Sequence, residues 1–285
     1  MIPILDTHLH LLYPKNFTYE WCADFPTLQA DFTIEGYEEL TQDLGILGAI
    51  FMEVDVPESQ ISKEAKFFSE LANDEQNKLA GVIAACRPES KNFDELLEAS
   101  LTDKVCGLRR VLHVVPDELS QSELFRTNIQ SLSKHNLPFD LCINQSQHEL
   151  AHDLIKSCPD TQFVLDHCGG PTLDQENFTI WHNSLKSISL LPNVVCKISG
   201  IIASLPTESD VTTLNPWLDS TLEHFGADRV MIGSDWPVCN LSKDVPTWLN
   251  KVRTHFASLS EDEQRKLFHQ NAERVYGMNI SKISK

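Results

Sequence analysis

The feature that most constrains the fold of this chain is a short apolar, β-branched run that recurs with a helical pattern in between. Eight such runs lie at 2–5, 48–54, 79–85, 105–112, 137–143, 162–166, 193–199 and 229–235. Between them, apolar residues recur at every third or fourth position, as in amphipathic helices. Strands that alternate with helices favour a parallel sheet, and eight of them favour a (β/α)8 TIM barrel over a doubly wound sheet.

The length of 285 residues is compatible with one large barrel, so we expect residues 1–285 to form a single domain. No Gly-rich dinucleotide fingerprint or P-loop follows any of the runs, which counts against the doubly wound alternative. Residues 14–33 lack periodicity and predict a long loop over the active face. The last segment has Ser260 as its expected N-cap, Glu263 three residues later and Gly277 at its end.

Charge and hydropathy exclude two classes of partner. The net charge of −18, from 23 basic and 41 acidic residues, would repel a phosphate backbone, so we expect no nucleic acid partner. No apolar stretch approaches the roughly 18 residues of a membrane span, so we expect no membrane partner. Only three residues precede Ile4, which leaves no room for a secretory leader and predicts a cytoplasmic protein.

The cysteines predict no disulfide framework, because a chain of this length does not need covalent staples and contains no CxxC pair. We interpret them as free, buried, small apolar residues. They are Cys22, Cys86, Cys106, Cys142, Cys158, Cys168, Cys196 and Cys239.

Two histidines directly after the first run are the first sign of a site. In "ILDTHLHLLYP" (4–14), His8 and His10 are two residues apart, so in an extended chain both imidazoles project to the same side and can share one ligand. Asp6 follows the same alternation. The alternative interpretation is that one histidine packs in the core and the other is solvated.

Two further strand ends carry polar residues. In "GSDWP" (233–237), Pro237 biases the preceding residue toward an extended conformation and places Asp235 at the end of the eighth strand. That strand borders the first in a closed barrel, so Asp235 should lie beside the histidine pair, although an aspartate here could also cap the next loop. The sixth run ends in "LDHCGGP" (165–171), where His167 is either a catalytic or ligating residue or a hydrogen-bonded turn residue.

The fourth run supplies the expected substrate contacts. Consecutive strand residues face opposite sides, so only one of Arg109 and Arg110 faces the barrel interior. With His113 nearby, that arginine could hold a carboxylate or hydroxyls bidentately; alternatively it pairs with a helix carboxylate. Further candidate contacts are Asn144, Lys197 and Trp236.

In this order the motifs resemble the amidohydrolase superfamily, and more closely its TIM-barrel lactonases of fuconolactone, rhamnonolactone and 2-pyrone-4,6-dicarboxylate. The motifs that carry the resemblance are "DTHLH", "GLRRVLHVVPD", "LPFDLCI", "FVLDHCGGP", "VVCKISG" and "GSDWP". The resemblance implies a hydrolase that opens the lactone of a sugar acid. It also implies that His8 and His10 bind a metal or polarise the carbonyl, that His167 faces the reacting group, and that Asp235 activates water and ligates any metal.

The chain departs from metal-dependent members at the fifth strand, which offers Asn144 and no histidine before His148. No lysine is present there either, so a carbamylated-lysine dinuclear centre is not supported. Glu53 could complete a mononuclear site with the histidine pair, or it could be a salt-bridged strand-end carboxylate. Zinc lowers the pKa of water from about 15.7 to about 7. A lactone is an activated ester, for which general-base help of about 10²–10⁴ could suffice. We expect a divalent ion, zinc, and leave open whether it is required.

Two other functions are compatible with parts of this pattern. A metal-dependent decarboxylase of an aromatic or unsaturated carboxylic acid shares the HxH pair and the strand-eight aspartate, but the missing strand-five histidine counts against it. A non-catalytic barrel that binds a small molecule is disfavoured because His8, His10, His167 and Asp235 are all present. The expected partner is a small lactone or sugar acid, whose identity the pattern does not specify, and it does not specify the oligomeric state.

Overall fold

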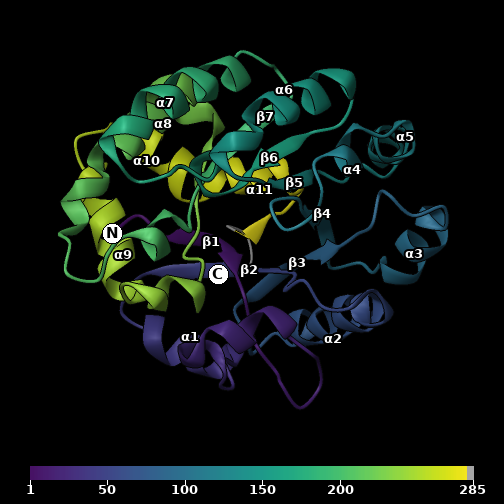
Figure 1. The fold of residues 1–285 in the computed structure, drawn as a ribbon. Helices are drawn as coiled ribbons and strands as arrows, with labels where there is room; N and C mark the ends of the chain where they lie inside the picture. Colours follow the sequence, from purple (N-terminus) through teal and green to yellow (C-terminus); the bar gives the residue numbers. More distant parts are fainter. Residues whose placement is uncertain (281–285) are drawn as a thin grey trace.

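A computed structural model describes residues 1–280 of the chain. It contains a sheet of eight parallel strands in sequence order, surrounded by helices (Figure 1). The strands are β1 (Ile4–Leu9), β2 (Ile46–Met52), β3 (Leu79–Ala85), β4 (Val105–Val111), β5 (Phe139–Cys142), β6 (Phe163–Leu165), β7 (Val194–Ile198) and β8 (Val230–Ile232). The α-helices are α1 (Ile34–Thr41), α2 (Ile61–Asn73), α3 (Phe93–Ser100), α4 (Glu118–Gln121), α5 (Glu123–Ser131), α6 (His148–Ser157), α7 (Gln175–Ser189), α8 (Asn215–Phe225), α9 (Val245–His255), α10 (Glu261–Arg265) and α11 (Asn271–Val275).

The sheet closes between β1 and the segment that follows β8. Leu9 and Trp236 form a parallel bridge. The Asp235 amide donates to the carbonyl of His8 at 2.8 Å, and the His10 amide donates to the carbonyl of Trp236 at 2.7 Å. These bonds confirm the predicted (β/α)8 barrel and bring the two ends of the chain's strand series together.

Each of the predicted runs overlaps a strand, but β2 begins two residues before its run and β1 extends beyond its run. The run at 2–5 predicts a strand that ends before Asp6, whereas β1 extends to Leu9. Polar residues continue the strand because its backbone has partners on both sides, in β2 and in the segment after β8. His8 therefore lies within the strand, with His10 directly after it.

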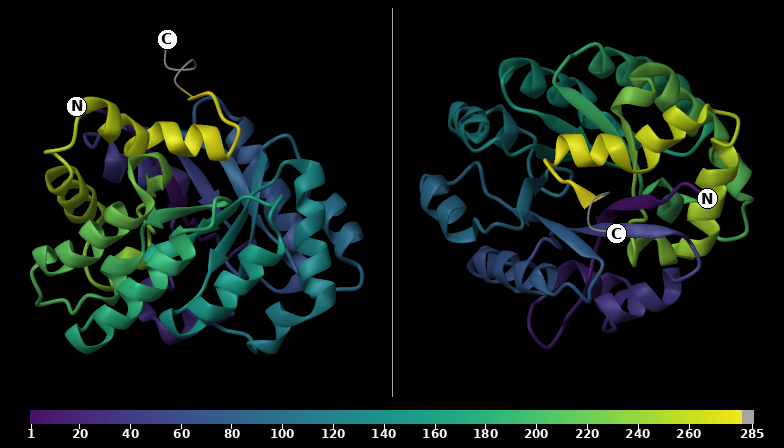
Figure 2. Two further views of the ribbon diagram at one scale, coloured as in Figure 1. Left: turned by 90° about the horizontal axis from the view of Figure 1, so that it is seen from above. Right: turned by 180° about the vertical axis from the view of Figure 1, so that it is seen from behind.

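The barrel interior is filled by one apolar cluster that also includes part of the C-terminal helix. Ala272 from α11 and Tyr276 after it pack against inward-facing strand residues such as Leu5, Ile50 and Val164. Figure 2 shows the C-terminal helices lying across the end of the barrel at which the N-terminus is found. The helices fill that end, so a site can form only at the opposite end, where the carboxyl ends of the strands lie.

Local signals at the chain's loops and caps agree with the structure. Residues 14–33 form a loop with two short 3-10 turns, and the Trp21 indole donates to the Val54 carbonyl at 3.0 Å. Ser260 and Glu263 form the expected capping box, and Gly277 has a φ of 64°. All eight cysteines are free, as predicted, and seven of them are buried, whereas Cys106 is only partly buried. In the part of the chain that the structure describes, no helix is both long and apolar enough to cross a bilayer.

Candidate active site

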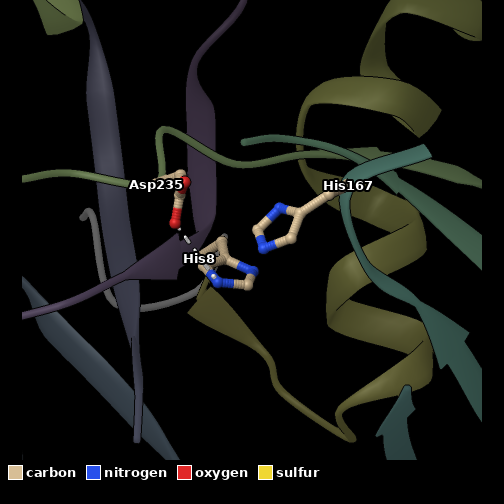
Figure 3. Close-up of side chains that lie close together, drawn as sticks. All are labelled: His8, His167 and Asp235. Atoms are coloured by element: carbon tan, nitrogen blue, oxygen red, sulfur yellow. Dashed lines mark ion pairs between the residues drawn. The ribbon is translucent and has the colours of Figure 1, made fainter. Parts of the chain in front are cut away.

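His8, His10 and Asp235 form a compact triangle at the strand ends. The Nε2 atoms of His8 and His10 are 3.2 Å apart. Oδ1 of Asp235 lies 3.5 Å from Nε2 of His8 and 3.3 Å from Nε2 of His10. His167, which follows β6, joins the group with its ring 4.5 Å from that of His8 (Figure 3). The structure thus brings together the four residues that the motifs indicated.

Asp6 does not share this site, although it follows the alternation of the two histidines. The register of β1 against β2 shifts between Asp6 and Leu9, so the side-chain alternation is interrupted before His8. The Asp6 carboxylate instead accepts hydrogen bonds from the Tyr37 hydroxyl at 2.6 Å and the Ser234 amide at 2.8 Å. Asp6 thereby ties β1 to α1 and to the segment after β8.

The residues after β6 and β8 have an unusual backbone. His167 has a φ of 54° and Asp235 a φ of 58°, in the left-handed region that side chains with a Cβ seldom adopt. Such conformations cost of order 1–3 kcal/mol and cluster at functional sites. Ser199 Oγ lies 3.0 Å from Nδ1 of His167, and a Cβ on Gly200 would approach that nitrogen to 2.1 Å. The glycine therefore leaves the space that the imidazole occupies.

Arg109 is the arginine of the fourth strand that faces the barrel interior, and Glu53 holds it there. Its Nε donates to Oε1 of Glu53 at 2.6 Å, while Oε2 accepts from the Asp55 amide at 2.7 Å. Burial would raise the pKa of Glu53, but the charges of Arg109 and Arg87 outweigh it and lower the pKa. Both oxygens of Glu53 are thus engaged away from the triangle. Nη1 of Arg109 lies 3.4 Å from Nε2 of His8.

The other residues predicted to contact the substrate are found in different environments. Arg110 pairs with Glu89 at 2.8 Å, on the opposite side of β4 from Arg109. His113 is exposed after β4, and Asn144 is exposed and caps the turn at Gln145–Gln147.

Trp236 and Lys197 are buried. The Trp236 ring packs between those of Phe32 and Tyr37, at centroid distances of 5.2 and 5.7 Å. Lys197 is fully buried beneath the triangle and ion-pairs with Asp140, which also accepts a hydrogen bond from the Tyr276 hydroxyl at 2.9 Å. Lys197 is therefore shielded from solvent on all sides.

Asp166 is a residue of the site to which the sequence analysis assigned no role. It is fully buried, with Oδ1 at 3.5 Å from Nδ1 of His8 and 3.4 Å from Nζ of Lys197. Neither carboxylate oxygen accepts a hydrogen bond of good geometry from a described residue. A carboxylate beside one ring nitrogen favours a proton on that nitrogen. Asp166 thus leaves Nε2 of His8 to face Asp235. The signal in the sequence was its place at the end of the sixth run.

The pKa values of the ionisable groups in the site shift in different directions. Burial would raise the pKa of Asp235, but the charge of His167 and contacts with His10 and His8 outweigh it and lower the pKa to about 2. Burial lowers the pKa of His8 well below its usual value. For His167, burial is outweighed by the charge of Asp235, and the pKa is raised. An ionised carboxylate therefore lies beside a neutral and a more basic imidazole, an arrangement suited to acid–base chemistry.

The triangle also fits a divalent metal ion in charge and in spacing. Asp166 is paired with Lys197 at 3.4 Å and with Arg109 at 3.8 Å, whereas Asp235 has no lysine or arginine partner among the described residues. The triangle's sides of 3.2, 3.3 and 3.5 Å match the spacing expected between ligands of a tetrahedral zinc ion. That spacing is about 3.3 Å for bonds of about 2.0–2.1 Å.

Comparison with known proteins agrees with this site and fold. Residues 5–278 match the amidohydrolase family. The chain belongs to the amidohydrolase family. This amidohydrolase is 26% identical over 291 residues to the L-fucono-1,5-lactonase of Burkholderia multivorans, with 96% of both chains covered. It is 25% identical over 199 residues to the L-rhamnono-gamma-lactonase of Scheffersomyces stipitis, with 61% of this chain and 59% of that protein covered.

A solved structure shares the whole fold of this amidohydrolase. The crystal structure of an amidohydrolase from Burkholderia multivorans with bound zinc has a TM-score of 0.88 at 24% identity. The match covers 97% of this chain and 100% of that one. The resemblance stated from the motifs is confirmed at the level of family and fold, and the protein is an amidohydrolase-type hydrolase.

Proposed function

We propose that this amidohydrolase hydrolyses the lactone ring of a sugar acid at the His8–His10–Asp235 triangle. The observation that carries the proposal is the triangle itself, a buried carboxylate within 3.5 Å of two imidazole nitrogens. The names of the relatives, L-fucono-1,5-lactonase and L-rhamnono-gamma-lactonase, support the choice of substrate class.

In the proposed reaction Asp235 is the general base. Its carboxylate takes a proton from water while the water oxygen attacks the lactone carbonyl carbon. The bond between that carbon and the ring oxygen then breaks, and Asp235 returns the proton to the departing alkoxide. The low pKa of Asp235 keeps it ionised at neutral pH, so the base is present in its active form.

His167 is proposed to donate a hydrogen bond to the substrate. Its raised pKa favours the protonated ring, which is a stronger donor to an oxygen that gains negative charge. His8, His10 and Asp235 would hold a divalent ion, zinc in this proposal, which polarises the carbonyl as a Lewis acid. The guanidinium of Arg109 lies 3.4 Å from Nε2 of His8 and adds positive charge next to the triangle.

The charges at the barrel mouth favour an uncharged lactone over one that carries carboxylates. Among the described residues at the strand ends, Arg109 is paired with Glu53, Arg110 with Glu89, and Arg87 with Asp55. A carboxylate group on the substrate would therefore find no unpaired arginine among them. We expect polyhydroxylated aldonolactones to be better substrates than 2-pyrone-4,6-dicarboxylate.

A pH-indicator assay with a panel of aldonolactones and 2-pyrone-4,6-dicarboxylate tests the proposal. We expect Asp235→Asn to lower kcat/KM by about 10²–10⁴, because it removes the base but keeps the side-chain shape. Asp55→Asn is the matched control, since it makes the same change at another strand end. We expect this control to lose less than about tenfold.

Two results would overturn the proposal. One is an Asp235→Asn variant that retains wild-type turnover of the best aldonolactone. The other is a wild-type protein that opens no lactone but releases carbon dioxide from aromatic or unsaturated acids, as the decarboxylase alternative requires. Repeating the assay after chelation, with metal content measured, shows whether the ion is needed.

A further inference from the structure

We propose that His148, the first residue of α6, is a positioning residue that holds His167 in the orientation needed for catalysis. The inference rests on the proposed function, in which His167 donates a hydrogen bond to the substrate. His148 acts through the backbone of the turn after β6, to which His167 belongs.

The turn after β6 has a backbone that needs support from outside. Four consecutive residues, from His167 to Gly170, have positive φ values of 54°, 54°, 75° and 60°. Left-handed residues normally occur singly, and the first two of these four carry a Cβ, for which this region is costly. The turn therefore depends on contacts with neighbouring elements to keep its shape.

Two buried side chains from other elements bind successive carbonyl groups of this turn. The Trp181 indole on α7 donates to the Cys168 carbonyl at 2.8 Å. Nε2 of His148 lies 2.6 Å from the next carbonyl oxygen, that of Gly169. A carbonyl oxygen only accepts, so Nε2 carries a proton and donates. A Cβ on Gly169 would come within 2.7 Å of the same nitrogen, so this close contact requires glycine.

His148 is itself held in one orientation and one tautomer. The residue is 2% exposed, and its Nδ1 lies 2.7 Å from Oγ of Ser184 on α7. Burial lowers the pKa of His148, which favours the neutral ring. With the proton on Nε2, Nδ1 accepts from the Ser184 hydroxyl. The ring therefore ties α6 and α7 to the turn that carries His167.

The next pair of helices contains a matched contact away from this turn. Nδ1 of His182 on α7 lies 2.7 Å from Oγ of Ser220 on α8. The same types of side chain thus join two helices at the same distance. A variant at His182 therefore measures the effect of losing such a helix contact alone.

The first experiment measures kcat and KM of His148→Leu on the best aldonolactone of the panel. We expect kcat to fall by about 10–10², because misplacing a catalytic group by about 1 Å has effects of this size. We expect KM to change less than about threefold, since the lost interaction forms in the transition state. His148→Gln should recover most of kcat, because its amide N–H can donate to the Gly169 carbonyl. His182→Leu should keep the wild-type kcat.

Ser184→Ala is a milder variant that keeps the His148 ring in place. It removes the hydroxyl that selects the tautomer of that ring, and we expect kcat to fall about threefold. If His148→Leu does not fold, a wild-type kcat in Ser184→Ala would overturn the proposal.

The second readout does not depend on turnover. The ring resonances of His167 are recorded by NMR in protein labelled with ¹⁵N-histidine and are assigned with the variant His167→Gln. They should shift in His148→Leu, return toward wild type in His148→Gln, and stay in place in His182→Leu. Such shifts report the position of the His167 ring, which a loss of stability alone would not move.

Unchanged His167 resonances in folded His148→Leu would overturn the proposal, whether or not kcat falls. A wild-type kcat in that variant would also overturn it. If the wild-type protein hydrolyses no lactone, the proposed function fails, whereas the resonances still decide whether His148 positions His167.

Discussion

At the scale of single residues, the two arginines of β4 show how one position decides a role. Arg109 faces the barrel interior and contacts Glu53 and His8, whereas Arg110 pairs with Glu89 on the other side of the strand. Glu53 was a candidate metal ligand, and its engagement with Arg109 suggests that it positions the arginine instead.

Glu53→Gln should leave the metal content of the protein unchanged but destabilise it. Removing one partner of a buried ion pair leaves Arg109 uncompensated and costs about 3–5 kcal/mol. His10→Gln is the comparison, because it removes a member of the triangle and should lower the metal-to-protein ratio. Elemental analysis and urea denaturation of both variants provide the measurements. A loss of metal in Glu53→Gln equal to that in His10→Gln would make Glu53 a ligand.

Glu64 on α2 should make stability depend on pH. The side chain is fully buried, and burial together with the charge of Glu53 raises its pKa well above the usual value. The folded protein therefore holds this proton more tightly than the unfolded chain, so stability falls as pH rises above about 4.5. The Glu64→Gln variant should be as stable as wild type at about pH 4 and more stable than wild type at about pH 8.

Urea denaturation across this pH range measures the effect of Glu64→Gln. The control is Glu70→Gln on the exposed face of the same helix, which should change stability little at either pH. Equal pH dependence in wild type and Glu64→Gln would show that the buried carboxyl is not responsible.

At the scale of elements, the irregular register of β1 separates structural from functional side chains. The shift between Asp6 and Leu9 turns Asp6 toward Tyr37 of α1 while His8 faces the site. Asp6 in turn accepts the amide of Ser234, close to Asp235. The contact between β1 and α1 thus supports the closure of the barrel beside the base.

Tyr37→Phe should weaken this closure. It removes a 2.6 Å hydrogen bond to a buried carboxylate, which is worth about 1.5–3 kcal/mol. Tyr13→Phe is the control, because its hydroxyl makes a longer bond of 3.3 Å to the Ile34 amide and should cost less. Thermal and chemical denaturation give the stabilities, and kcat/KM should fall with Tyr37→Phe since His8 follows Asp6 closely. Equal losses in the two variants would contradict this account.

At the scale of the whole molecule, buried charges link the plugged end of the barrel to the site. Tyr276 after α11 bonds to Asp140 of β5, Asp140 pairs with Lys197 of β7, and Lys197 approaches Asp166. Asp166 then contacts His8 in β1. Residues from both ends of the chain therefore share one buried network.

Lys197→Met should destabilise the protein by about 3–5 kcal/mol, because it leaves two carboxylates buried without their common cation. Adding Asp140→Asn should recover part of this loss, since the two residues interact directly and their effects should not be additive. Urea denaturation of the single and double variants measures the coupling. Strictly additive losses would show that the pair is not coupled.

The sequence alone determined the barrel and the composition of its mouth, because strand and helix periodicities are local and strand ends in a barrel converge. It therefore predicted His8, His10, His167 and Asp235 as one group, which the structure brings together.

Only the tertiary structure decided which way neighbouring side chains face and what they contact. The one-residue register shift in β1 makes Asp6 and His8 point to opposite faces of the sheet. The contact with Glu53 is made by Arg109 and not by Arg110. The proximity of Cys142 to Asp166 and His167 depends on two strands pairing side by side, which no local pattern encodes.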